Sequence, residues 1–169
     1  MSRSVAALAL GVQLLVVPPA LARIAPLGDP ISLDVPLECA NGDPAVAALD
    51  DGGFVAVWTD GAILSARRVD AAGKPTATEI VLASGLPLAP EAVALPGGGY
   101  AVAWFDPLRS RVLARFVDAA GSAGPEVEVG VAGPDPGSGF GGLDATAGPD
   151  GTLAVTWANA SAAGAACNP

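Results

Sequence analysis

The sequence predicts an all-β protein assembled from repeated antiparallel units of four short strands. The first observation is a segment that occurs three times, at residues 44–60, 90–106 and 143–159. Each copy holds an apolar stretch, a turn that contains glycine and a second apolar stretch that ends in Trp, with Asp or Asn two residues later. The apolar stretches are short and have turn signals on both sides, which favours buried strands over helices.

The first unit sets out the expected order of strands. Its first apolar stretch begins at Pro44 and leads to a turn at residues 51–53, where glycine allows the positive φ of a tight hairpin. Residues 54–58 form a central strand because they are apolar on both faces. A third strand covers residues 63–70 and ends at Ala-Ala-Gly, and a fourth strand lies near residues 79–82.

The second unit repeats this order, and the third unit repeats its first half. In the second unit the central strand is expected at residues 100–104, followed by strands at 111–118 and 126–129. The octapeptide at residues 66–73 matches residues 114–121 at seven of eight positions, so the second half of the unit recurs as well. Such internal repetition is typical of propellers and other repeat arrays.

The repeat spacing predicts a propeller-like arrangement. The units span about residues 44–89, 90–142 and 143–169, and their spacing of 46 and then 53 residues suits β-propeller blades. Four antiparallel strands are also the content of one blade. The chain offers about two and a half blades, whereas closed propellers have at least about four. We therefore expect an incomplete array, either open or assembled with further copies, and the alternative fold is a small β-sandwich.

The repeat also resembles a known family. The run Asp-Gly-Gly-Phe-Val-Ala-Val-Trp at residues 51–58, followed by Ala-Arg-Arg-Val-Asp-Ala-Ala-Gly at residues 66–73, is similar to the propeller-like repeats of bacterial secreted and cell-surface proteins. Blades of that family carry a D-G-G-F-V-V-x-W core followed by R-F-D-A-x-G. The resemblance covers roughly residues 31–160. It implies a scaffold and no particular activity, because such scaffolds carry many unrelated functions.

The N-terminal residues have the three parts of a secretory signal peptide. Arg3 provides a basic start, an apolar run of about a dozen residues follows, and cleavage is expected after Ala22. The apolar run is shorter than the roughly 20 residues that a bilayer requires, which favours secretion over an anchor. We therefore expect an extracellular or periplasmic protein with no membrane attachment after cleavage. The predicted parts are a signal peptide at residues 1–22, an N-terminal strand near 31–35 and linker within 23–43, and a repeat domain at 44–169.

The two cysteines, Cys39 and Cys167, lie near opposite ends of the mature chain. An even number of thiols in an oxidising compartment favours a disulfide between them. In the loop-entropy model, a closure of this length contributes on the order of 5 kcal/mol of stability. Two separate thiols, or a bridge to another chain, are the alternatives.

Composition excludes several classes of function. The net charge of −9 argues against nucleic-acid partners, which need clustered Lys and Arg. The absence of histidine excludes Ser-His-Asp and Cys-His couples and histidine-ligated metals. No pattern predicts catalytic residues, so we expect no enzyme, no cofactor and no metal site. Calcium alone stays open, because the acidic loops at residues 41–43, 50–51 and 134–137 offer oxygen ligands, but their lack of the ligand spacing of a calcium loop argues against a specific site.

Two sets of repeated side chains are candidates for a site. The tryptophans Trp58, Trp104 and Trp157 end apolar strands, and we interpret them as a structural core in preference to a sugar-stacking surface. Each is followed after two residues by Asp60, Asp106 or Asn159, which could meet at one rim to bind a cation or a hydroxyl-rich ligand. Asp and Asn are also common turn formers, and this interpretation is favoured for them and for Asp70 and Asp118.

These observations predict a secreted, non-catalytic β-repeat scaffold or interaction module. The alternative is a glycan-binding or glycan-processing relative of propellers that uses carboxylates on one rim. The sequence does not identify a partner. Self-association and binding to an envelope or glycan partner are both compatible with it.

Overall fold

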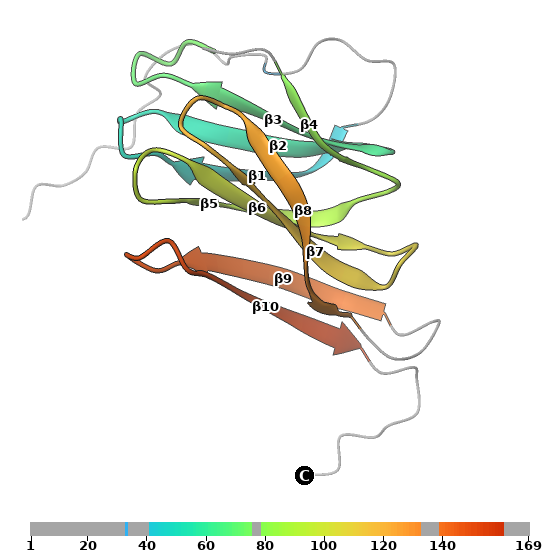
Figure 1. Cartoon of the computed structure of the whole chain (residues 1–169). Helices are drawn as coiled ribbons and strands as arrows, with labels where there is room; N and C mark the ends of the chain where they lie inside the picture. The colour runs from blue at the N-terminus through green and yellow to red at the C-terminus, as the bar shows by residue number, and fades with distance from the viewer. Residues whose placement is uncertain (1–32, 34–40, 76–78, 133–138, 161–169) are drawn as a thin grey trace, which may run out of the picture. The chain divides into compact units, whose positions relative to one another are not determined.

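The computed structural model describes residues 33, 41–75, 79–132 and 139–160, which all belong to one compact unit at residues 31–169. The predicted all-β class is confirmed, because the described residues form antiparallel strands in three sheets (Figure 1). No helix that could cross a membrane occurs among them. The strands are β1 (Asn41–Ala48), β2 (Phe54–Asp60), β3 (Ile63–Val69), β4 (Ile80–Ser84), β5 (Leu88–Ala94), β6 (Tyr100–Asp106), β7 (Arg111–Val117), β8 (Ala123–Val131), β9 (Gly139–Ala147) and β10 (Leu153–Ala160).

The three sheets follow the order of the chain. Sheet A has the order β1-β2-β3-β4, sheet B has the order β5-β6-β7-β8, and sheet C pairs β9 with β10. The strands β2 and β6 are interior, as the apolar runs at residues 54–58 and 100–104 predict. One boundary differs from the prediction: β1 begins at Asn41, inside the segment expected to be linker. The predicted signal peptide at 1–22, Cys39 and Cys167 lie outside the described residues.

The hairpin between the first and second strands has the same hydrogen bonds in all three sheets. In sheet A, the Leu49 N–H donates to Gly53 O at 2.9 Å, and the Gly52 N–H donates to Leu49 O at 3.0 Å. Sheets B and C have the same two bonds at residues 95–99 and 148–152. The glycine that donates the second bond has a φ of 82°, 86° or 83°, a left-handed conformation that favours glycine.

A second glycine in this turn is required by the third strand. A Cβ on Gly53 would lie 2.3 Å from Val69 O, and a Cβ on Gly99 would lie 2.7 Å from Val117 O. Both distances are far below ordinary contact, so these positions exclude larger residues. Sheet C has Thr152 here, and among the described residues no third strand pairs with β10.

The first strands share a bulge as well. Asp43 and Ala89 both adopt left-handed backbone, with φ of 44° and 46°, where β1 and β5 shift register against β2 and β6. Sheet C has a register shift between Ala158 and Asn159, at the matching end of its hairpin. Bulges bend a strand and increase its twist. All three sheets therefore have an irregular register at the end where β2, β6 and β10 finish.

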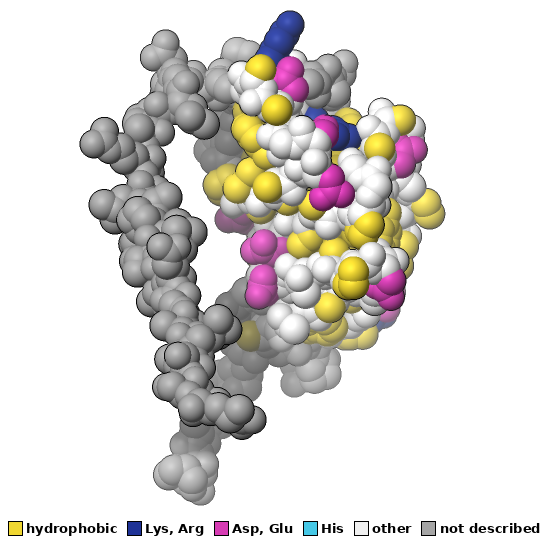
Figure 2. All heavy atoms as spheres, turned by 90° about the vertical axis from the view of Figure 1, so that its left-hand side faces the viewer, with side chains coloured by type: hydrophobic (Ala, Val, Ile, Leu, Met, Phe, Trp, Pro, Cys, Tyr) yellow, Lys and Arg dark blue, Asp and Glu magenta, His cyan; other side chains and the backbone are white. Residues whose placement is uncertain are grey.

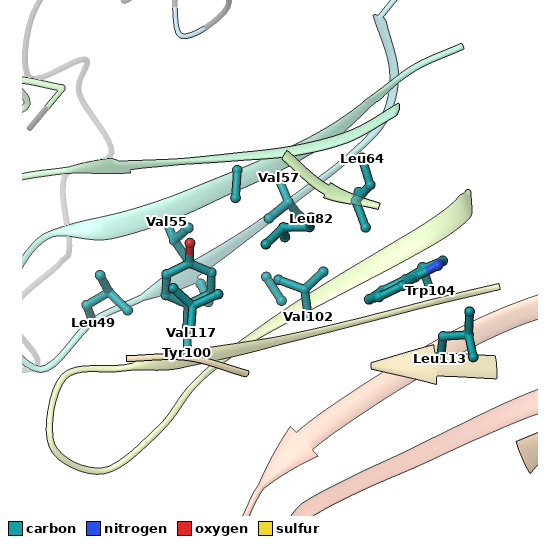
Figure 3. Packing of buried hydrophobic residues seen from close by; sticks show 13 residues of the cluster. Leu49, Val55, Val57, Leu64, Leu82, Tyr100, Val102, Trp104, Leu113 and Val117 are labelled. Atoms are coloured by element: carbon teal, nitrogen blue, oxygen red, sulfur yellow. The ribbon is translucent and has the colours of Figure 1, made fainter. Parts of the chain in front are cut away.

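The main core lies between sheets A and B. One face of β6, with Tyr100, Val102 and Trp104, points toward Val55 and Val57 of β2 (Figure 3). Leu64 and Leu82 of sheet A and Leu113 and Val117 of sheet B complete this cluster. These side chains are nearly all fully buried, and alternation along each strand sends the intervening residues to the other face of the sheet.

A second cluster joins sheets B and C. Phe105 and Val112, on the opposite face of sheet B, pack with Leu143, Val155 and Trp157. Trp104 thus packs toward sheet A and Trp157 packs toward sheet B. Each of these tryptophans lies against the sheet that precedes it in the sequence.

Tyr100 carries a buried hydroxyl without a hydrogen-bond partner among the described residues. Burial raises the pKa of Tyr100 to about 12, because the charged phenolate is disfavoured in the core. Its oxygen points toward Val55 in Figure 3. The first unit has Phe54 at the same repeat position.

Titration of Tyr100 is therefore expected to weaken the fold at high pH. The pKa of Tyr100 is higher in the folded state than the ordinary value of 10.0. The stabilising contribution of this difference is therefore complete below about pH 10 and is lost as pH rises toward 12. The sequence contains one tyrosine, so tyrosinate absorbance reports this group alone. Tyr100→Phe should remove this pH dependence and leave stability at pH 7 unchanged or raised by about 1–3 kcal/mol. Tyrosinate formation near pH 10 in the folded protein would contradict the burial.

Candidate functional site

Asp106 is a buried carboxylate that organises its own turn. Its Oδ1 accepts hydrogen bonds from the Leu108 N–H at 2.9 Å and the Arg109 N–H at 3.1 Å. Its Oδ2 lies 3.3 Å from Arg109 Nε. The side chain is 7% exposed. Both oxygens are thus engaged within the loop that joins β6 to β7, as expected of a turn-forming residue.

Asp60, at the same position in sheet A, has different surroundings. The loop after it contains only Gly61 and Ala62, so no equivalent of the Leu108 and Arg109 N–H groups is present. Its Oδ1 is buried and has no hydrogen-bond partner among the described residues. The loop after β2 therefore leaves this carboxylate without the turn contacts that satisfy Asp106.

The three candidate rim residues lie at or near the ends of the second strands of three successive sheets. Asp60 and Asp106 end the second strands of successive sheets, and packed sheets are about 10 Å apart. Asn159 pairs with Phe140 in sheet C, and its side chain lies outside the described structure. No cluster of three or more metal-ligating side chains occurs among the described residues.

The other repeated aspartates also bind their own backbone. Asp70 Oδ1 accepts from the Ala72 and Lys74 N–H groups at 3.0 and 2.8 Å, and Asp118 Oδ1 accepts from the Ser122 N–H at 2.8 Å. In the first hairpins, Asp51 accepts from the Gly53 N–H and Asp150 from the Thr152 N–H. The bond from Gly53 lowers the pKa of Asp51, and the bond from Thr152 lowers the pKa of Asp150.

The tryptophans occupy internal positions. Trp104 is 1% exposed within the core between sheets A and B, and Trp58 is 7% exposed. Trp157 is half-buried, and its indole lies so close to Gly130 that a Cβ there would be 2.7 Å from it. Trp104 and Trp58 therefore offer almost no surface for stacking a sugar ring.

The outward surface of the turns shows scattered acidic side chains among apolar and small ones (Figure 2).

Arg68 links sheets A and B at the end where the hairpin turns lie. Its Nη2 lies 2.9 Å from Asp51 Oδ2, and its Nη1 donates to Gly98 O at 3.2 Å and Ala119 O at 2.8 Å. Arg68 is one of the residues that line a cleft of about 340 Å³. The repeat pattern did not predict a role for this arginine. The signal was present, because the matching position in the second unit holds Phe116 and breaks an otherwise near-identical octapeptide.

Two further clefts lie beside sheet B. One of about 490 Å³ is lined by Leu95, Pro96, Phe116, Asp118 and Ser122, among others. A smaller one of about 210 Å³ lies between β4 and β7 and contains Arg109, Arg115 and Glu126. There Arg109 Nη1 donates to Glu126 Oε1 at 2.6 Å, so the acid and one arginine neutralise each other.

Glu91 and Asp144 form a carboxylate pair that the repeat pattern did not predict. Glu91 lies on β5 and Asp144 on the neighbouring first strand β9. Partial burial raises the pKa of Glu91, and the charge of Asp144 raises it further. The first unit has Ala45 at the same position, which is why the repeat did not mark the pair as a shared feature.

Comparisons with protein-family models, curated proteins and solved structures gave no match for this chain.

The contribution of the Glu91–Asp144 pair to the stability of the fold is expected to be more favourable in acid than at neutral pH. Because the folded state raises the pKa of Glu91 above 4.5, the stabilising effect of its protonation is complete below about pH 4.5 and is lost as pH rises through the folded value. Glu91→Gln should therefore unfold at a higher temperature than the wild type at pH 7, with the difference vanishing in acid. Glu128→Gln, a more exposed change beside Arg111, is the matched control and should give no such gain. A lower melting temperature for Glu91→Gln at pH 7 would contradict the repulsion.

Proposed function

We propose that the protein is a secreted, non-catalytic β-repeat scaffold or interaction module with its sheets arranged as propeller-like blades. The observation that carries the proposal is how the repeated acidic residues are used. Asp51, Asp70, Asp106 and Asp118 accept hydrogen bonds from backbone N–H groups of their own turns. Carboxylates that hold turns together serve the shape of the repeat, and this supports a structural role for them.

The stacking of the sheets supports the propeller-like arrangement over a small sandwich. A sandwich has two sheets, whereas the described residues form three that follow one another along the chain. Contacts between sheets run mainly through the first strands, from β1 to β5 and from β5 to β9. Blades around a common axis approach each other most closely at their innermost strands, which matches this pattern.

An alanine substitution separates the scaffold from a carboxylate site. Asp106→Ala should lower the free energy of unfolding by about 1–3 kcal/mol, because two backbone N–H groups lose their acceptor. The measurement is denaturant unfolding, combined with binding of both proteins to a polysaccharide array. We expect no glycan binding by either protein. A wild type that binds a polysaccharide, with binding lost in a folded Asp106→Ala variant, would favour the glycan-binding alternative.

Export forms part of the proposal and has its own test. Expression in a bacterium with an intact secretion pathway should yield a chain outside the cytoplasm whose first residue is Arg23, because the peptidase cuts after Ala22. Intact mass measured without reduction should also show Cys39 and Cys167 resistant to alkylation, as a disulfide requires. A cytoplasmic chain that keeps residues 1–22 would overturn export, and two alkylated thiols would overturn the bridge.

A further inference from the structure

The cleft between β4 and β7 contains more positive than negative charge. Its volume is about 210 Å³, and it is lined by residues 81–84 of β4 together with Arg109, Arg115 and Glu126. Arg109 Nη1 donates to Glu126 Oε1 at 2.6 Å, so these two side chains balance each other's charge. Arg115 is therefore the charge that remains.

Arg115 has no acidic partner among the described residues. It is not one of the arginines that form ion pairs there, which are Arg68, Arg109 and Arg111. The residue is half-buried, and its Nε is buried without a hydrogen-bond partner among the described residues. A buried N–H group without an acceptor costs stability, and a bound anion is one of the explanations for such a group in a native protein.

The repeat shows what an arginine at this position can do. Arg115 alternates along β7 with Leu113 and Val117, which belong to the core between sheets A and B, so its side chain leaves β7 on the side of sheet A. Arg67 has the same position in the first unit. Its Nη1 donates to the carbonyl oxygen of Leu33 at 2.8 Å. This position of the repeat can therefore present a guanidinium to an oxygen acceptor on another segment.

Glu126 is the acid of this chain that lies opposite Arg115 in the register of β7 and β8. It forms its ion pair with Arg109 instead. Arg109 Nε also lies 3.3 Å from Asp106 Oδ2, which links this arginine to the turn after β6. Glu126 is thus engaged at the side of the cleft away from Arg115, and the cleft has one uncompensated positive charge.

We infer that Arg115 binds a carboxylate of a partner polypeptide in this cleft, either an Asp or Glu side chain or a C-terminal carboxylate. The inference rests on the proposed function as an interaction module and names the chemistry that the module recognises. A guanidinium is a planar fork of donors, and its geometry matches the two oxygens of a carboxylate.

Charge and size favour a carboxylate over other anions. One uncompensated positive charge suits a group with one negative charge, whereas a doubly charged phosphate is repelled more strongly by Glu126 and by the net charge of −9. The cleft is also smaller than the roughly 300–1,000 Å³ of sites that enclose whole small molecules, so it suits the end of a side chain. Val81, which is 55% exposed and lines the cleft, offers an apolar contact beside the acid.

The test is an NMR titration of the protein with the peptide acetyl-Gly-Glu-Gly-amide, followed through the backbone amide signals of residues 81–84. The wild type should show saturable shifts with a Kd on the order of 10 mM, as expected for one charge-assisted contact. The neutral peptide acetyl-Gly-Gln-Gly-amide should bind at least about tenfold more weakly, because it lacks the charge. This comparison uses the wild type alone and does not depend on the folding of a variant.

Two variants should change the affinity in opposite directions. Arg115→Gln should weaken binding of the acidic peptide at least about tenfold, because the guanidinium is lost. Glu126→Gln should strengthen it about three- to tenfold, because the acid that repels the ligand is removed. Arg111→Gln is the matched control and should leave the affinity unchanged, since Arg111 is on the same strand, pairs with Glu128 and does not line the cleft.

Each result decides the inference. Shifts that are lost in Arg115→Gln, kept in Arg111→Gln and strengthened in Glu126→Gln support it, with circular dichroism to show that each variant is folded. Absent shifts at about 50 mM peptide, or equal binding of the neutral peptide, overturn it. Tighter binding of inorganic phosphate or galacturonate at the same ionic strength would overturn a polypeptide partner. A negative result leaves the scaffold proposal intact, because that proposal is judged by Asp106→Ala and the polysaccharide array.

Discussion

The contact between β6 and sheet A is the interaction on which the rest of the fold depends. Tyr100, Val102 and Trp104 point from one face of β6 into a cluster with residues of all four strands of sheet A. The same cluster combines the large Trp104 with small residues of the opposing sheet, among them Ala47 and Ala66. Close packing of this kind fixes the distance between sheets, since voids and overlaps both cost stability.

The interface between sheets B and C is packed in the same way, again by a tryptophan that points toward the preceding sheet. Trp157 packs on sheet B beside Gly130, where even a methyl group would collide with the indole. Each tryptophan therefore requires small residues at the facing positions of the preceding sheet. Sheets A and B are thus joined in the same way as sheets B and C, each time through a tryptophan that packs on the sheet before it.

Polar residues in this protein stabilise turns and rims more than they create a site. Asp106 and Asp70 are bound to nearby backbone, and Arg68 joins a carboxylate to two carbonyl oxygens of the next sheet. Two acidic exceptions among the described residues are the unpartnered Asp60 oxygen and the Glu91–Asp144 pair. Both are unfavourable for stability, because a buried or crowded carboxylate loses solvation that no donor replaces.

The sequence by itself determined the strands, their hairpins and their order, because these depend on residues close together in the chain. Alternation, glycine turns and the recurring Trp located β2 and β6 within two residues of their observed ends. Only the tertiary structure decided which faces are covered. Arg68 meets Gly98 and Ala119, and Glu91 meets Asp144, across sheets that a local pattern cannot bring together. Likewise Leu82 and Val129 occupy matching positions in their sheets but differ in exposure, and Leu82 is the one that belongs to the cluster containing Leu113 and Val117 of the next sheet.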